Sequence, residues 1–129
     1  MALELIQGRY ADNISLPFNE KLADGLTNQG LFIGPEINRS DAYAASRINI
    51  TVKQGEQTQQ FAGKHPNTLP QNPVYWLINF MSKRGTSFKA GQAIITGSYA
   101  GVVKVGFDQV TEIEYQDIGK YAVEFKAIK

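Results

Sequence analysis

Two hydroxyl side chains flank a glycine within residues 88–101, in a pattern that could present them to a ligand. Thr96 and Ser98 stand on either side of Gly97. Glycine has no Cβ, so its backbone can adopt positive φ and can let another group approach closely. The apolar run 93–95 predicts a short strand buried on both faces. Two interpretations follow: a core strand that ends in a glycine turn, or a strand end that faces a ligand.

A carboxylate near the N-terminus is the second group that could do chemistry. Alternation predicts a strand at 2–6, on which Glu4 shares a face with Ala2 and Ile6. Glutamate is seldom buried without a partner. Glu4 is therefore either an exposed carboxylate at a sheet edge or a carboxylate held in a site by a cation. Arg9 follows closely in the sequence and could be its partner.

Three further polar patterns favour ordinary structural roles. His65, the only imidazole, lies in a loop before a proline and is expected to be solvated. A Ser–His–acid triad is not excluded by residue counts, although no Gly-x-Ser-x-Gly elbow precedes a helix. Glu112 and Glu114 share a strand face and could resemble a metal pair, but the alternating charges nearby favour a solvated outer face. Thr27 is expected to be a turn hydroxyl.

The elements that must position these groups are mostly strands. Clean alternation predicts one hairpin with strands at 47–53 and 57–62, and a terminal hairpin with strands at 110–115 and 121–126. The shorter elements that are expected are a turn at Asp12 and Asn13, a helix at 19–25 that ends at Gly25, and a strand at 31–33.

The clearest helix is expected to begin at Asn72, which would cap it, with Pro73 at its first position. Apolar residues repeat at helical spacing from Val74 to Met81, and Gly85 supplies a stop. Aromatic residues broaden this apolar face, so the helix is expected to pack on two sides. These residues are Tyr75, Trp76 and Phe80.

Length and composition indicate one globular domain over residues 1–129, with 43% hydrophobic and 19% charged residues. Thirteen basic and twelve acidic side chains nearly cancel, so neither nucleic acid nor a membrane surface is an expected partner. The absence of cysteine excludes disulfides and thiolate metal sites. No apolar run approaches membrane-spanning length and no signal pattern begins the chain, so a cytoplasmic location is expected.

Five short motifs occur in a fixed order along essentially the whole chain. They are Ala2-Leu3-Glu4-Leu5-Ile6 with Arg9, Leu22-Ala23-Asp24 with Thr27, Asn72-Pro73-Val74-Tyr75-Trp76-Leu77, Lys89-Ala90-Gly91 with Ile94-Ile95-Thr96-Gly97-Ser98, and Gly119 before an alternating strand. In this order they resemble the C-terminal domain of the fumarylacetoacetate hydrolase superfamily, in its 2-keto-4-pentenoate hydratase and oxalocrotonate decarboxylase branch. The resemblance implies a mostly β fold with one to two helices, arranged as a mixed β-roll or sandwich.

The resemblance also implies a function for the candidate residues. It implies a metal-dependent hydratase of aromatic catabolism, which adds water to a 2-hydroxy-2,4-dienoate to give a 4-hydroxy-2-oxo acid. Glu4 would bind Mg²⁺ or Mn²⁺, which prefer oxygen ligands and can act as Lewis acids. Arg9 and Thr27 would be catalytic, as support for the carboxylates and as a contact to substrate or water. Thr96 and Ser98 would bind the substrate, and a homo-oligomer is expected.

Departures from the family's pattern keep other functions open. The family's Glu-x-Glu pair and catalytic Lys precede the motif that contains Glu4, and this sequence has no counterpart of them. Gln7, Gly8, Gly25 and Thr27 also differ from the usual residues. Because Mg²⁺ normally takes several oxygen ligands, the chain would be the C-terminal part of a longer enzyme or a drifted relative. The alternative functions are a non-catalytic binding or assembly module and an acylpyruvate-type C–C hydrolase.

Overall fold

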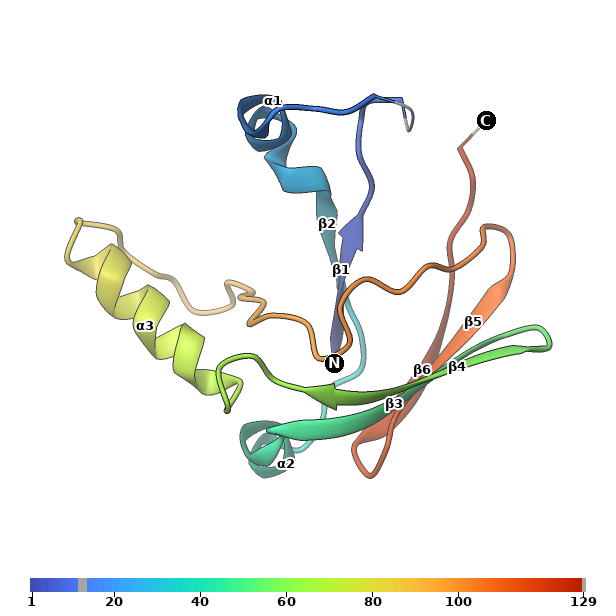
Figure 1. Cartoon of the computed structure of the whole chain (residues 1–129). Helices are drawn as coiled ribbons and strands as arrows, with labels where there is room; N and C mark the ends of the chain where they lie inside the picture. The colour runs from blue at the N-terminus through green and yellow to red at the C-terminus, as the bar shows by residue number, and fades with distance from the viewer. Residues whose placement is uncertain (12–13, 129) are drawn as a thin grey trace. The chain divides into compact units, whose positions relative to one another are not determined.

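The computed structural model describes residues 1–11 and 14–128, which form two compact units, Met1–Glu36 and Ile37–Lys129. Each unit contains its own antiparallel sheet (Figure 1). The expected mostly β, mixed fold is confirmed. The expected turn at Asp12 and Asn13 lies outside the described residues. Among the residues that are described, none of the helices has the length and apolar character needed to cross a membrane.

The first unit is a two-stranded sheet whose strands are joined by a short helical segment. β1 (Ala2–Ile6) has the predicted bounds and pairs antiparallel with β2 (Asn28–Ile33), which begins earlier than expected. Between them lie α1 (Phe18–Ala23) and the single turn η1 (Gly25–Thr27). The register of the two strands shifts after Leu5, so the sheet is irregular next to η1.

The second unit is built on a four-stranded antiparallel sheet with strand order β4-β3-β5-β6. Its strands are β3 (Arg47–Gln54), β4 (Gln57–Lys64), β5 (Val110–Tyr115) and β6 (Gly119–Glu124). Both predicted hairpins are therefore confirmed. The two hairpins, β3–β4 and β5–β6, are distant in the sequence. They form one sheet because β3 also pairs with β5.

One face of this sheet forms the core of the second unit. The period of two along each strand places alternate side chains on that face. The buried side chains on it are Ile48, Ile50, Val52, Thr111, Ile113 and Val123. The same alternation leaves Glu112 and Glu114 exposed, opposite Lys53 and Lys120 in the neighbouring strands. The prediction that these carboxylates form a solvated outer face is confirmed, and each lies across from a lysine in the strand register, an arrangement that is favourable in a sheet.

The strand predicted at 93–95 is absent. These residues have no regular secondary structure, and Ile95 is 43% exposed. An apolar β-branched run becomes a buried strand only if neighbouring strands satisfy its backbone groups and cover its faces. The sheet of the second unit uses other segments, and residues 96–106 instead contact β4 and the end of β3 irregularly. Tyr99 O accepts from the Lys64 amide at 3.1 Å, and Gln54 exchanges two hydrogen bonds with Gly106.

Two helices belong to the second unit. α2 (Arg39–Ala44) was not anticipated; the Asn38 side chain caps it by accepting from the Ser40 amide at 3.0 Å. α3 (Gln71–Ser82) is the predicted long helix, but its N-cap is Pro70. The expectation that Asn72 caps it is wrong, because the Asn72 side chain donates to the carbonyl of Asn67 inside the preceding turn.

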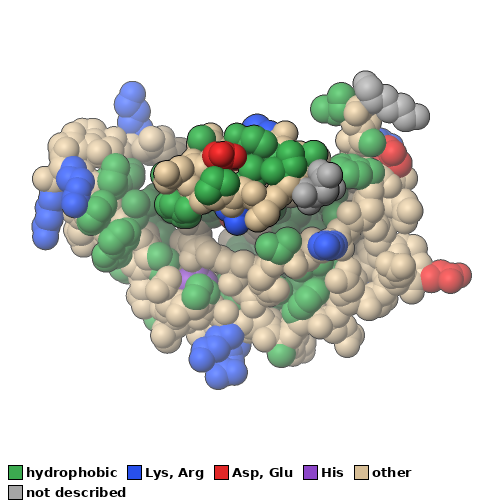
Figure 2. All heavy atoms as spheres, turned by 45° about the horizontal axis from the view of Figure 1, so that its top comes forward, with side chains coloured by type: hydrophobic (Ala, Val, Ile, Leu, Met, Phe, Trp, Pro, Cys, Tyr) green, Lys and Arg blue, Asp and Glu red, His purple; other side chains and the backbone are tan. Residues whose placement is uncertain are grey.

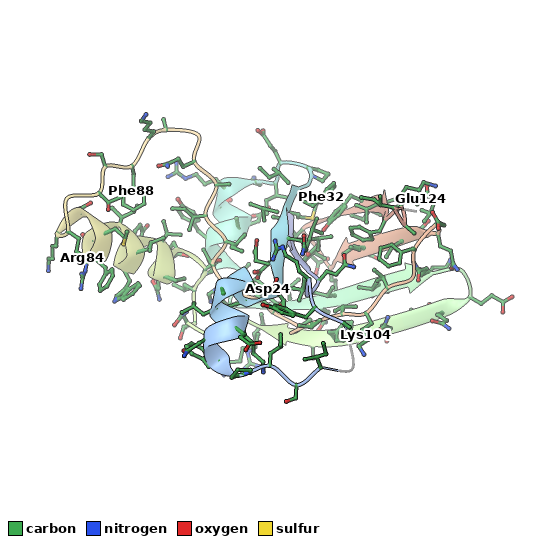
Figure 3. The ribbon with its side chains drawn as sticks, turned by 90° about the horizontal axis from the view of Figure 1, so that it is seen from above. Asp24, Phe32, Arg84, Phe88, Lys104 and Glu124 are labelled. Atoms are coloured by element: carbon green, nitrogen blue, oxygen red, sulfur yellow. The ribbon has the colours of Figure 1, made fainter. Side chains whose placement is uncertain are left out.

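The aromatic face of α3 is exposed, so the prediction that the helix packs on two sides is also wrong. None of its residues is buried, and Trp76 is 62% exposed. Its ring stacks on Phe80 at 4.8 Å between centroids, and the Arg84 guanidinium lies 3.5 Å from the centre of the Phe80 ring. Arg84 marks the C-terminal end of α3 in Figure 3, and hydrophobic side chains are visible on the surface in Figure 2. Helical periodicity identifies an apolar face but does not supply the surface that would cover it.

Two tyrosines stack on each other on the neighbouring strands β5 and β6 of the four-stranded sheet. Tyr115 of β5 and Tyr121 of β6 stack with 6.3 Å between ring centroids. Burial raises the pKa of both phenols, and for Tyr121 the neighbouring Tyr115 raises the pKa further. The folded state therefore favours the neutral form of both side chains.

Truncation of the core should be far more costly than truncation of the outer face of the same strand. Ile113→Ala should lower the free energy of unfolding by about 2–5 kcal/mol, because Ile113 is 5% exposed and its removal leaves a cavity. Val110→Ala, at a position that is 56% exposed, should change it by less than about 0.5 kcal/mol. Urea unfolding followed by far-UV circular dichroism measures both, and equal losses would contradict the assigned core face.

The tyrosine pair predicts a loss of stability in alkaline solution. Tyr115 and Tyr121 have folded-state pKa values above the unfolded value of about 10, so their contribution is complete below about pH 10 and is lost as the pH rises further. In an absorbance titration, the phenols of Tyr115 and Tyr121 should ionise only above the unfolded value of about 10. Tyr121→Phe should weaken the pH dependence of unfolding above pH 10, and an unchanged dependence would contradict the assignment.

Candidate functional site

The first unit contains a strained left-handed turn at η1. Gly25, Leu26 and Thr27 have φ values of 66°, 55° and 66°. Glycine adopts this conformation freely and serves as the predicted end of α1, whereas for other L-residues the left-handed conformation costs about 1–2 kcal/mol each. Such strain persists only where the surroundings enforce it, and it is concentrated at functional sites. The structure thus places Thr27, a predicted catalytic residue, on the most unusual backbone of the first unit.

Arg9 holds this turn in place from both ends. Its Nη1 donates to the Asp24 carbonyl at 2.6 Å and to Asp24 Oδ1 at 3.0 Å, and its Nη2 donates to the Asn28 carbonyl at 3.1 Å. Only the planar fork of arginine offers several donors in a fixed arrangement. The Asp24 side chain is 2% exposed, and the guanidinium compensates its buried charge. The Gln7 amide adds a bond to the Thr27 carbonyl at 2.8 Å.

Glu4 joins the same hydrogen-bonded group at its exposed edge. Its Oε1 accepts from the Asn28 side-chain amide at 2.7 Å, and the Asn28 carbonyl accepts from Arg9. The structure therefore gathers Glu4, Arg9 and Thr27 around two residues to which the sequence had assigned no role, Asp24 and Asn28. Asp24, at the end of α1 in Figure 3, lay within a recognised motif; Asn28 carried no signal of its own.

This group does not form a complete site for Mg²⁺ or Mn²⁺. Across residues 1–11 and 14–128, no three acidic or histidine side chains are placed to share a metal ion. The Asp24 carboxylate is engaged by Arg9, which leaves Glu4 as the carboxylate that could contribute a ligand. Because a hard dication normally requires several oxygen ligands, the described residues do not fit a resident metal by themselves.

A pocket of about 340 Å³ opens beside the strained turn. Its volume falls within the range of small-molecule sites. Half of its lining residues are apolar, and Lys21 of α1 adds a positive charge to the wall that also contains Thr27. The lining residues are Ile14, Ser15, Leu16, Lys21, Leu26 and Thr27. No local sequence pattern predicts this pocket, since its wall combines a loop, a helix and a turn whose proximity depends on the backbone at Gly25 to Thr27.

A second group of candidate residues lies in the second unit, around His65. The expectation that His65 is solvated is wrong, because its relative exposure is 0%. The ring meets Tyr99 edge-on at 5.2 Å, and its Nε2 lies 3.4 Å from Thr96 Oγ1. The backbone bond between Lys64 and Tyr99 brings residues 96–99 over the loop that carries His65. A contact so distant in the sequence leaves no local pattern that could predict burial.

The hydrogen bonds of His65 exclude a nucleophilic role for Thr96. The Asn67 amide donates to His65 Nδ1 at 3.1 Å, so Nδ1 is an acceptor and the proton of the neutral ring lies on Nε2. Nε2 then donates to Thr96 and cannot remove its proton. A triad histidine instead donates from its outer nitrogen to a carboxylate and accepts from the nucleophile. The Ser–His–acid alternative is therefore not realised at His65.

The two predicted substrate-binding hydroxyls differ in their surroundings. Ser98 Oγ donates to the Gly101 carbonyl at 2.9 Å and accepts from the Ala100 amide at 3.2 Å, so it closes a local turn. Thr96 is partly exposed and contacts His65. Between them Gly97 has a φ of 109°, and a Cβ there would lie 3.2 Å from Pro66 Cγ. This position requires glycine both for its conformation and for space.

Comparison with known proteins supports the resemblance drawn from the motifs. The chain is 27% identical over 127 residues to 2-keto-4-pentenoate hydratase from Paraburkholderia xenovorans (strain LB400) and to 2-keto-4-pentenoate hydratase 3 from Pseudomonas putida. Each match covers 98% of this chain and 47% of the relative. The chain thus spans about half the length of the curated relatives it matches. No family model matches it.

The arginine clamp predicts a measurable coupling between Arg9 and Asp24. Arg9→Met should lower the opening free energy around η1 by about 1–3 kcal/mol, less than for a fully buried pair because Arg9 is 54% exposed on its side chain. Hydrogen exchange at the Gln7 amide, which is bonded to Thr27, reports this opening. Arg9→Lys should also weaken the turn, since one ammonium group cannot bond both ends.

Asp24→Asn and the double variant complete the measurement as a double-mutant cycle. The double variant should be more stable than the sum of the two single losses predicts, because it leaves no buried carboxylate without its cation. Strict additivity of the two single effects would contradict the clamp.

Proposed function

We propose that this chain forms part of a hydratase that adds water to 2-hydroxy-2,4-dienoates and gives 4-hydroxy-2-oxo acids. The observation that carries this proposal is the similarity to two 2-keto-4-pentenoate hydratases along 98% of the chain. The five ordered motifs fall within the same match. A role in the catabolism of aromatic compounds and a cytoplasmic location are parts of the same proposal.

The pocket beside η1 supports a small carboxylic acid as the substrate. The ammonium group of Lys21 would bind the carboxylate, while Ile14 and Leu16 would contact the hydrocarbon part. Thr27 would contact the substrate or the attacking water, and Arg9 would act indirectly by holding the turn. The strain at Thr27 is consistent with this role, because a strained backbone can fix a side chain in a working orientation.

We also propose that Glu4 contributes one ligand to Mg²⁺ or Mn²⁺. Its carboxylate is exposed, and the Asn28 amide occupies one of its oxygen atoms while the other stays available. The remaining oxygen ligands would come from outside the described residues, from water, or from the substrate. Thr96 and Ser98 are proposed to contribute to substrate binding, in which a direct contact suits Thr96 better because Ser98 is engaged in its own turn.

A second candidate function is a non-catalytic binding or assembly module. Two observations favour it: the described residues lack a three-ligand metal group, and the aromatic face of α3 is exposed. Such a module would assemble into a stable oligomer, which light scattering can detect, and would not turn over any dienoate. A hydrolase acting on acylpyruvates has no comparable observation in its favour.

The two candidates are separated by a turnover assay. The protein that contains this chain should consume 2-hydroxypenta-2,4-dienoate in the presence of Mg²⁺ or Mn²⁺, with loss of the dienoate absorbance. Glu4→Gln should lower kcat/KM by about 100-fold or more if the carboxylate binds the metal. Lys21→Met should raise KM by roughly tenfold with a smaller effect on kcat, as expected for the loss of a charge-assisted contact to the carboxylate.

Glu112→Gln is the matched control, because Glu112 is an exposed carboxylate on the outer face of β5. It should leave turnover unchanged. Absence of turnover with either metal by the protein that contains the unsubstituted chain, together with a stable oligomer, would overturn the hydratase proposal in favour of the assembly module.

A further inference from the structure

A series of hydrogen bonds with a defined direction ends at the Thr96 hydroxyl. The backbone N–H of Asn67 donates to His65 Nδ1 at 3.1 Å, which leaves the proton of the neutral ring on Nε2. Nε2 lies 3.4 Å from Thr96 Oγ1 and can only donate to it. His65 is completely buried, so both of its ring nitrogens must form hydrogen bonds within the protein and not with water. The fold therefore requires that Nε2 donates to Thr96.

The Thr96 hydroxyl therefore has its proton available for an acceptor. A hydroxyl offers one proton and two lone pairs, and the bond from His65 uses a lone pair. No acceptor for this proton is within hydrogen-bond distance among residues 1–11 and 14–128, and Thr96 is partly exposed. Ser98 differs, because its proton is donated to the Gly101 carbonyl.

The backbone that carries Thr96 is also held in place. Gly97 follows it with a φ of 109° and packs against Pro66, the residue next to His65. Tyr99 contacts the His65 ring and donates its hydroxyl to the Ala45 carbonyl. The donor is thus supported on both sides by contacts to the loop of His65 and to the end of α2.

We propose that His65 is a positioning residue that presents Thr96 as a hydrogen-bond donor to a carboxylate oxygen of a small organic acid. A carboxylate is the complementary group, because an ionised carboxylate only accepts hydrogen bonds. The identity of the acid as a 2-oxo or 2-hydroxydienoic acid rests on the proposed function, whereas the direction of the hydrogen bonds and the need for an acceptor do not.

The direction of the bonds can be measured first. His65 is the only histidine in the chain, so its two ring nitrogens give unambiguous signals in a long-range ¹H–¹⁵N spectrum. At neutral pH the proton should be found on Nε2, in slow exchange with water. A proton on Nδ1, or rapid averaging over both nitrogens, would overturn the proposal.

Carboxylate binding is then measured with oxalate as the probe, by calorimetric titration of the full chain. Thr96→Val should weaken oxalate binding by about tenfold or more, as expected for a lost hydrogen bond to a charged group. Thr96→Ser, which keeps the hydroxyl, should stay within about threefold of the original affinity. Thr58→Val makes the same chemical change at an exposed position of β4 and should have no effect.

Two variants of His65 separate positioning from packing. His65→Gln places an amide donor near the former Nε2 and loses the acceptor for Asn67, whereas His65→Asn keeps the acceptor and loses the donor. Both should be less stable than the original chain, but at equal folded fraction only His65→Asn should lose oxalate affinity as Thr96→Val does. Equal affinities for the two folded variants would overturn the positioning role.

The outcomes also separate this inference from the proposed function. Oxalate binding that depends on Thr96, with no dienoate turnover by the protein that contains the chain, would support the inference and contradict the hydratase proposal. Dienoate turnover that Thr96→Val leaves unchanged would support the hydratase proposal and contradict the inference. Absence of any oxalate binding by the unsubstituted chain would overturn the inference.

Discussion

In each unit of this protein, the backbone around one buried polar side chain depends on that side chain's hydrogen bonds. Each donor of the buried group needs an acceptor, and each acceptor needs a donor. In the first unit the acceptor-only carboxylate of Asp24 requires a donor, and Arg9 supplies it. In the second unit both ring nitrogens of His65 require partners, which are the Asn67 amide and the Thr96 hydroxyl. A buried polar group without a partner costs about 1–3 kcal/mol, and an unpaired charge costs more. The first requirement acts on the turn that carries Thr27, and the second acts on the contact between His65 and Thr96.

The strained turn of the first unit is a consequence of the first requirement. Because the guanidinium of Arg9 bonds to the carbonyls of Asp24 and Asn28, the intervening residues must turn sharply, and they do so in the left-handed region. The turn brings Leu26 and Thr27 to the wall of a pocket that also includes Lys21. The same arginine is exposed on its outer side, so one residue can stabilise the fold and position a binding surface without touching a ligand.

The exposed aromatic face of α3 and the irregular segment at 93–95 share a physical cause. Both segments have the apolar pattern of buried elements, and both lack a covering surface among the described residues. Trp76 and Phe80 compensate locally by stacking on each other, with Arg84 over the Phe80 ring.

Alternating and helical periodicity in the sequence determined the two hairpins, the long helix, the buried face of β3 and the solvated position of Glu112, since these depend on neighbours that are close along the chain. Ordered motifs also selected Glu4, Arg9 and Thr27 as a group. Only the tertiary structure decided that His65 is buried, that Asp24 and Asn28 complete the group around Arg9, and that residues 93–95 form no strand. Those outcomes depend on contacts between segments far apart in the sequence, where the polar partner or the covering surface leaves no mark on the local pattern.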